Sequence, residues 1–126
     1  MVMEAPVNLR LAQYSEIMGR HGDGERWAER LIDDGRNLAV WISAPPGTPP
    51  DPHIHPDFNE WWAILKGELT WEVGENRPLI EARDGDIVFV PEGMRHHIST
   101  VGDETSLRLP FTNTESPHIS PESDEA

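Results

Sequence analysis

The sequence has no cysteine among its 126 residues. This excludes disulfides, a thiolate nucleophile, cysteine-based zinc fingers and iron–sulfur clusters. Basic residues are also scarce, because 10 Lys plus Arg stand against 23 Asp plus Glu, a formal net charge of -13 at pH 7. Such a chain lacks the clustered cations that bind phosphates, so we expect neither nucleic acid nor a membrane surface among its partners.

Long hydrophobic runs are missing as well. The longest apolar runs cover residues 38–42 and 61–65, far short of the roughly 20 residues that span a bilayer. The first six residues, MVMEAP, have neither the basic start nor the apolar core of a signal peptide. We therefore expect a cytoplasmic protein.

What the sequence does contain is a series of short apolar runs separated by turn signals. From Trp27 onward these runs recur at the spacing of an all-β sandwich or barrel. The prolines and glycines between them, such as Gly35 in the segment DDGR, favour tight turns. The predicted strands are residues 27–32, 37–43, 61–66, 68–73, 78–82, 86–90, 96–101 and 106–111.

These runs divide the chain into three parts. Residues 1–24 are expected to form an N-terminal extension with one weakly patterned helix at 9–18, and residues 25–111 a β-barrel. Residues 112–126 contain four acids, two prolines and no Lys or Arg, which predicts a flexible acidic tail. Six of the 12 prolines lie in residues 45–56, so this connection is expected to be irregular.

Two histidines lie at the end of the proline-rich segment, and a glutamate follows it. Residues two apart in an extended chain point to the same side, so His53 and His55 can direct two imidazoles at one point. Glu60 has the opposite parity and joins them only if the chain is irregular in between. A further histidine, His96 or His97, follows a PEG turn; the two face opposite sides of a strand, and parity alone does not choose between them. Imidazole and carboxylate ligands suit a divalent iron, manganese, nickel, copper or zinc ion.

Two spaced patterns in this region resemble the two motifs of the cupin superfamily. The first is G-x5-H-x-H-x4-E-x6-G from Gly47 to Gly67, and the second is G-x5-P-x-G-x2-H from Gly85 to His96. The second motif usually ends in Asn four residues after its histidine, where this chain has Thr100. That Asn is not a metal ligand in the family, so the departure concerns the turn more than the metal.

The resemblance implies an all-β fold, the cupin double-stranded β-helix or jelly-roll barrel, with one divalent transition metal inside. By position, the implied ligands are three histidines and one glutamate, namely His53, His55, Glu60 and His96. Such a set leaves coordination positions open for water, dioxygen or a bidentate small-molecule substrate. Single-domain members of the family are often dimers, so a homodimer is expected.

The strand after Glu60 supplies candidate pocket residues. If it is regular, Trp62 and Ile64 share the ligand face, and Trp61, Ala63 and Leu65 face away. Trp62 would then stack on a planar ligand; the alternative, which is slightly favoured, is that the tryptophans fill the core or a dimer interface.

Two arginines are candidates for holding a substrate carboxylate, because a guanidinium binds one through two parallel hydrogen bonds. Arg95 immediately precedes His96 and joins Trp62 and Ile64 in the candidate pocket. For Arg108, the alternation Leu107-Arg108-Leu109 indicates a strand with solvent on the arginine side. We expect His97 on the outer face of its strand, and His21 and His118 exposed to solvent.

Several activities of the superfamily do not fit the sequence. Without cysteine, no Cys–Tyr crosslinked thiol dioxygenase site can form. Tyr14, the only tyrosine, lies outside the motifs, which argues against a tyrosine acid like that of sugar-epimerising cupins. Lys66, the only lysine, sits at a predicted strand end and is a poor Schiff-base candidate.

The remaining chemistry is that of the metal. A dioxygenase-type metalloenzyme acting on a small molecule is favoured. A Lewis-acid isomerase, hydrolase or decarboxylase is the second hypothesis, and a non-enzymatic module that binds a small ligand is the third. The sequence has no pattern of a helix-turn-helix, which argues against a stand-alone regulator.

Overall fold

The computed structural model describes residues 2–3, 6–21, 24–48, 59–73, 79–94 and 96–113, and the structural statements below refer to these ranges. Strands dominate the chain. In chain order the elements are β1 (Val2–Met3), α1 (Tyr14–Arg20), β2 (Trp27–Asp33), β3 (Asn37–Ala44), β4 (Glu60–Lys66), β5 (Glu68–Val73), β6 (Ile80–Arg83), β7 (Ile87–Val90), β8 (His96–Val101) and β9 (Ser106–Asn113).

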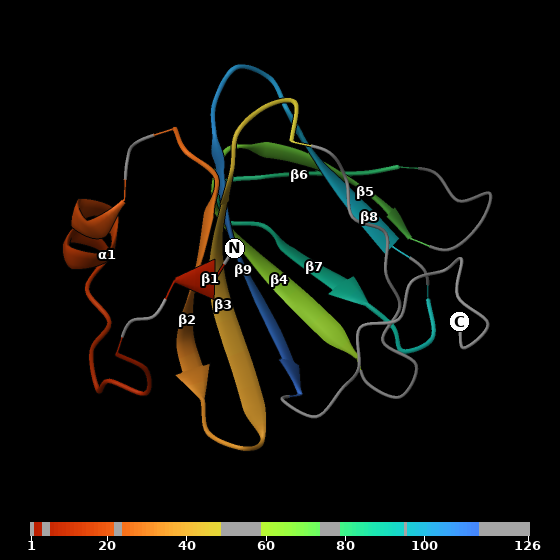
Figure 1. Cartoon of the computed structure of the whole chain (residues 1–126). Coiled ribbons are helices and arrows are strands. Elements are labelled where there is room, and N and C mark those ends of the chain that lie inside the picture. The colour runs from red at the N-terminus through yellow and green to blue at the C-terminus, as the bar shows by residue number, and fades with distance from the viewer. Residues whose placement is uncertain are drawn as a thin grey trace.

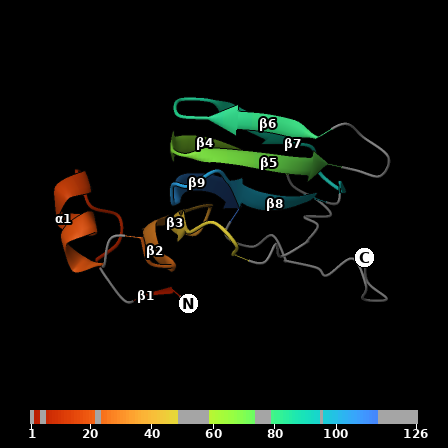
Figure 2. The same ribbon diagram turned by 90° about the horizontal axis from the view of Figure 1, so that it is seen from above.

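The strands form two sheets that enclose the core. The larger has the order β1-β2-β3-β9-β4-β7 and the smaller β6-β5-β8. Apart from the parallel pair β1–β2, the paired strands are antiparallel. Helix α1 and the smaller sheet lie on opposite sides of the larger sheet (Figures 1 and 2). The predicted all-β jelly-roll barrel is confirmed.

The core between the sheets follows from alternating side chains. In β4, Glu60, Trp62 and Ile64 point inward and are buried, whereas Trp61 and Leu65 are exposed, because successive side chains of a strand face opposite sides. Fully burying one aliphatic side chain such as Ile64 contributes roughly 1.5–3 kcal/mol. The barrel core consists of Trp62, Ile64, Leu69, Trp71, Ala82, Val88, Val90 and Ile98.

A second apolar cluster lies on the other face of the larger sheet. It joins Ile17 of α1 to Trp27, Trp41 and Leu107 of β2, β3 and β9. The larger sheet is therefore covered on both faces where α1 lies. The described part of residues 1–24 contacts the barrel through this helix, through the pairing of β1 with β2, and through hydrogen bonds between Asn8 and Asp33.

The helix differs from the predicted one. It spans Tyr14–Arg20 rather than residues 9–18, and Leu9 and Leu11 of the predicted segment are exposed. Only Ile17 of the helix is buried. Within the described ranges no helix is long and apolar enough to cross a membrane.

The predicted strands correspond to β2–β9, with every end within two residues of the prediction. β9 continues to Asn113, so residues 112 and 113 belong to the sheet and not to the predicted tail. Residues 114–126, with the rest of that tail and His118, and most of the predicted irregular connection lie outside the described residues.

Gly67, between β4 and β5, is required by its surroundings. Its φ is +100°, and a Cβ added there would lie 2.9 Å from the Cα of Ser106. A side chain would collide with the β9 backbone and strain its own. This glycine of the first motif therefore lets the two sheets approach where the chain passes from one to the other.

Candidate metal centre

Glu60 and His96 meet inside the barrel, although they come from different sheets. Glu60 opens β4 in the larger sheet, and His96 opens β8 in the smaller one. Oε1 of Glu60 lies 3.0 Å from Nε2 of His96, and their side chains are only 3% and 0% exposed. The two sheets thus bring a carboxylate and an imidazole together in the interior.

Neighbouring groups orient both side chains. The indole Nε1–H of Trp62 donates a hydrogen bond to Oε1 of Glu60 at 2.9 Å. On the far side of the imidazole, Nδ1 of His96 lies 3.3 Å from the carbonyl oxygen of Met94. A proton on Nδ1 satisfies that carbonyl and leaves the lone pair of Nε2 directed at Glu60.

This arrangement fits a metal ion. At 3.0 Å, this contact is either a hydrogen bond that a proton on Nε2 donates to the carboxylate or, with the proton on Nδ1, two lone pairs that can share a cation. Two ligands bound at right angles, each about 2.1 Å from a metal, are themselves about 3.0 Å apart. Nitrogen and oxygen donors together suit divalent transition metals.

The described residues contain part of the predicted ligand set. Glu60 and His96 are brought together, whereas His53 and His55 lie outside the described residues, as does Arg95 of the candidate pocket. Within the ranges that the structure describes, no group of three or more potential ligands gathers, at this site or at another.

His96 and His97 separate as neighbours in a strand must. The side chain of His97 is partly exposed and forms an ion pair with Glu72 of the adjacent β5. Ile98 and Thr100 share the inward side with His96 and are buried. The sequence left open whether His96 or His97 faces the interior, and in the structure it is His96.

Thr100, at the place where the second motif usually has Asn, ties three strands together. Its hydroxyl donates to the carbonyl oxygen of Ala44 at 3.0 Å and lies 2.9 Å from Oγ of Ser106. Ala44 ends β3 and Ser106 opens β9. The threonine thus links β8 to the larger sheet, a role that needs a short side chain with a hydroxyl.

Trp62 and Ile64 lie on the predicted face, and both belong to the barrel core. The ring of Trp62 meets Trp71 edge-on at 6.2 Å, while its N–H is used by Glu60. Trp62 therefore fills the core and holds the carboxylate at once.

The prediction that Arg108 faces solvent was wrong. Its side chain faces the barrel interior, with the guanidinium carbon 5.9 Å from the centre of the Trp62 ring, and the residue is only 8% exposed. Leu107 and Leu109 face the second cluster, beneath α1. Successive side chains of β9 therefore point to opposite faces of the sheet, and both faces are buried. Burial, with a smaller effect of the positive charge of Arg26, lowers the pKa of Arg108 to about 10.

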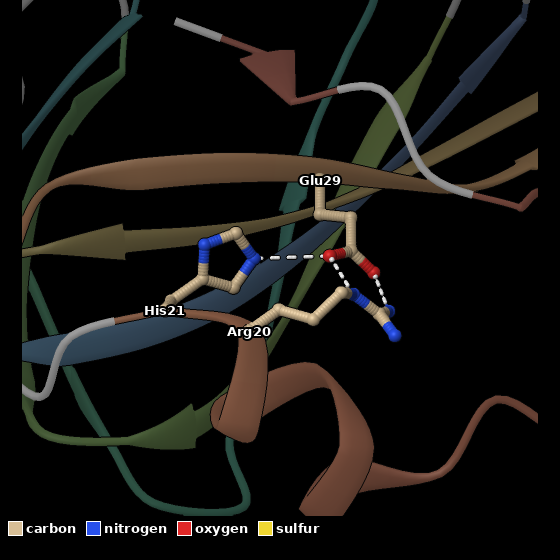
Figure 3. A network of polar contacts seen from close by, with 3 residues as sticks. All are labelled: Arg20, His21 and Glu29. Carbon is tan, nitrogen blue, oxygen red and sulfur yellow. Dashed lines mark hydrogen bonds and ion pairs between the residues drawn. The ribbon is translucent and has the colours of Figure 1, made fainter.

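A second polar group, unforeseen from the sequence, lies outside the barrel between α1 and β2 (Figure 3). Glu29 of β2 is fully buried and accepts hydrogen bonds from Nε and Nη2 of Arg20 at 3.1 and 2.5 Å. Nε2 of His21 lies 2.9 Å from the same carboxylate. Burial alone would raise the pKa of Glu29, but the hydrogen bonds and positive charge of Arg20 and His21 lower it below its ordinary value.

The expectation that His21 is exposed was also wrong. Its side chain is 4% exposed, and its ring stacks on Trp27 with 3.9 Å between ring centres. Because His21 directly follows α1, the docking of that helix brings it to β2. No sequence signal marked this contact, since the helix itself was weakly patterned.

Comparisons with known proteins agree with this architecture. The family model described as the cupin domain matches residues 40–112, more than half of the chain. Among curated proteins, an oxalate oxidase of Triticum aestivum is 33% identical over 82 residues, covering 60% of this chain and 36% of that protein. The chain spans little more than a third of the length of the curated relatives it matches.

Solved structures share the fold. A conserved Klebsiella pneumoniae protein with a double-stranded β-helix domain superposes with a TM-score of 0.76 at 20% identity, covering 92% of this chain and all of that one. The oxalate decarboxylase of Lactobacillus farciminis, in a complex with formate, gives a TM-score of 0.61 at 24% identity, over 68% of this chain and 27% of that one.

Proposed function

This chain belongs to the cupin domain family, and we propose that it is a small-molecule metalloenzyme with dioxygenase-type chemistry. The proposed ligands of its single divalent metal are His53, His55, Glu60 and His96. The observation that carries the proposal is the buried contact between Glu60 and His96, a nitrogen–oxygen donor pair contributed by both sheets. Likeness to an oxalate oxidase supports an oxygen-dependent reaction on a small molecule.

The bound metal would supply open coordination positions and, as iron, manganese or copper, redox chemistry. The protein's own residues prepare the centre. The Trp62 N–H holds one oxygen of Glu60, and the Met94 carbonyl orients the His96 ring, the kind of outer contacts that position metal ligands. The surrounding apolar side chains, Ile64, Val90 and Ile98 among them, exclude water from the interior.

Oxygen consumption tests the reaction class. The purified protein is assayed against small diketones, catechols and carboxylic acids, before and after chelation and reloading with manganese, iron or zinc. Substrate-dependent uptake that chelation abolishes and manganese or iron restores supports the proposal. Product formation without oxygen uptake, sustained by zinc, would instead establish the Lewis-acid alternative. Ligand retention without any product would indicate a binding module.

We also propose that the protein is a homodimer that associates through the outer face of β4 and β7. This face carries only apolar side chains, Trp61, Ala63, Leu65, Ile87 and Phe89, of which Trp61 is 40% exposed and stacks on Phe111 at 4.2 Å. Two copies of a chain with a net charge of -13 repel each other, so an uncharged face favours their contact.

The dimer is tested by light scattering during size-exclusion chromatography. Trp61→Glu is expected to shift a dimer to a monomer without loss of fold. Glu81→Gln, an exposed change in β6 of the other sheet, serves as the control and should leave the mass unchanged. A wild-type monomer, or a dimer insensitive to Trp61→Glu, would refute this interface.

A further inference from the structure

Arg108 stands in the middle of the larger sheet and points into the barrel. In β9 it pairs with Ile42 of β3 on one side and Ile64 of β4 on the other. Its guanidinium lies against the ring of Trp62, whose N–H bonds to Glu60. A continuous series of contacts thus connects this arginine to the candidate metal ligands.

The guanidinium has donors without acceptors. Nε and Nη1 of Arg108 are buried and have no hydrogen-bond partner within the part of the chain that the structure describes. Glu60, a buried carboxylate on the same interior face, already contacts Trp62 and His96. Trp71 of the same core adds a second buried donor, its indole Nε1, that has no described partner.

A buried cation of this kind is costly for a structure to keep. Charged groups in protein interiors are normally paired, because desolvation exceeds what apolar contacts return. Burial lowers the pKa of Arg108 to about 10, so the group is still positively charged at neutral pH. Packing alone would be served better by a methionine or leucine at this position. An anionic ligand that enters the barrel would supply the missing acceptor.

We propose that Arg108 binds a carboxylate group of the small-molecule substrate inside the barrel. A guanidinium presents two parallel N–H donors to a carboxylate and holds it in one orientation. This inference rests on the proposed function insofar as the carboxylate belongs to the substrate of the metal centre. It specifies the substrate class, and it assigns the binding role to a strand that contributes none of the family-implied metal ligands.

Calorimetric titration tests the inference with paired probes. Formate, malonate and benzoate are each compared with the neutral amide of the same skeleton, using the protein with the metal it carries on purification. At least one carboxylate should bind the wild type, while its amide does not. Arg108→Met should weaken carboxylate binding at least tenfold. Arg108→Lys, which keeps the charge but loses the paired donors, should give an intermediate affinity.

Arg26→Met is the matched control, because Arg26 is the exposed arginine whose charge reaches Arg108. It should change carboxylate affinity by less than twofold. Circular dichroism and thermal melting check the fold. Arg108→Met is expected to melt at or above the wild-type temperature without ligand, and to lose the rise in melting temperature that carboxylates give the wild type. If Arg108→Met does not fold, Arg108→Lys provides the comparison.

Two results would overturn the inference. One is equal carboxylate affinity in the wild type and the folded Arg108 variants, which would mean that the metal alone binds the carboxylate. The other is a wild type that binds none of the three carboxylates. Elemental analysis distinguishes a failure of this inference from a failure of the proposed function. Carboxylate binding that depends on Arg108, in a protein that takes up no metal, would refute only the proposal that the protein is a metalloenzyme.

Discussion

Nε2 of His96 lies 3.0 Å from Oε1 of Glu60, and this contact joins the two sheets across the barrel interior. The residues are 36 positions apart in the chain, and each stands at the first position of its strand. Strand alternation turns both inward, and closure of the barrel brings them together. The fold therefore builds the donor pair directly, without a dedicated loop to carry it.

The hydrogen bond from Trp62 is expected to hold Glu60 in place for metal binding. Trp62→Phe removes the N–H and keeps most of the aromatic volume, so we expect a tenfold or larger loss of metal affinity, since outer-shell contacts are typically worth about 10–100-fold. Chelator competition measures the affinity. Trp61→Phe, the same change on the exposed side of β4, is the control. Equal affinities for both variants would show that the hydrogen bond has no such role.

The cluster around Glu29 predicts a pH-dependent stability. The pKa of Glu29 is lower in the folded protein than its ordinary value of 4.5, so its charge stabilises the fold at neutral pH. That contribution is lost as the pH falls below about 4.5 and through the folded pKa. Glu29→Gln should lower the free energy of unfolding by about 1–3 kcal/mol at pH 7, the cost of a weakened buried hydrogen-bond group.

Urea unfolding at pH 7, 5, 4 and 3.5 measures this effect. The difference between wild type and Glu29→Gln should shrink in the acidic samples, because the wild-type carboxyl becomes neutral there. Glu81→Gln, at an exposed position of β6, is the control and should show no such dependence on pH. A difference for Glu29→Gln that stays constant with pH would contradict the assigned role of its charge.

Alanine substitutions at two glycines with positive φ distinguish the cost of backbone strain from the cost of a steric collision. Gly35 has φ +88° and open space where a Cβ would lie, whereas a Cβ at Gly67 would lie 2.9 Å from the Cα of Ser106. We expect Gly35→Ala to cost about 1 kcal/mol from strain alone. Gly67→Ala should cost more than about 3 kcal/mol, because the β9 backbone must also move. Denaturant midpoints measure both costs. Equal costs would mean that the β9 backbone shifts with little loss of stability.

The sequence predicts the barrel well because its strands obey a simple alternation. In β4 one side of the sheet is core and the other is open, so the inward positions of Trp62 and Ile64 could be predicted from Glu60 onward. The pairing of Glu60 with His96 required the family resemblance, because no local pattern brings β4 and β8 together.

The same alternation fails for Arg108 and His21. β9 lies between β3 and β4 and is covered by the barrel core on one face and by α1 on the other, so polar and apolar positions are both buried. His21 is buried only because Ile17 anchors a short helix whose own sequence pattern is weak. Both errors have one cause, the packing of the N-terminal segment over a sheet that the sequence presents as open on that side.

Elemental analysis of the purified protein tests the proposed metal centre most directly, with His96→Ala and His97→Ala as a matched pair of adjacent substitutions. His96 is buried against Glu60, and His97 lies on the outer side beside Glu72. We predict one transition metal ion per chain in the wild type and in His97→Ala, and loss of the metal in His96→Ala. Equal loss in both variants, or a wild type that takes up no metal even on reconstitution, would contradict the proposed metal centre.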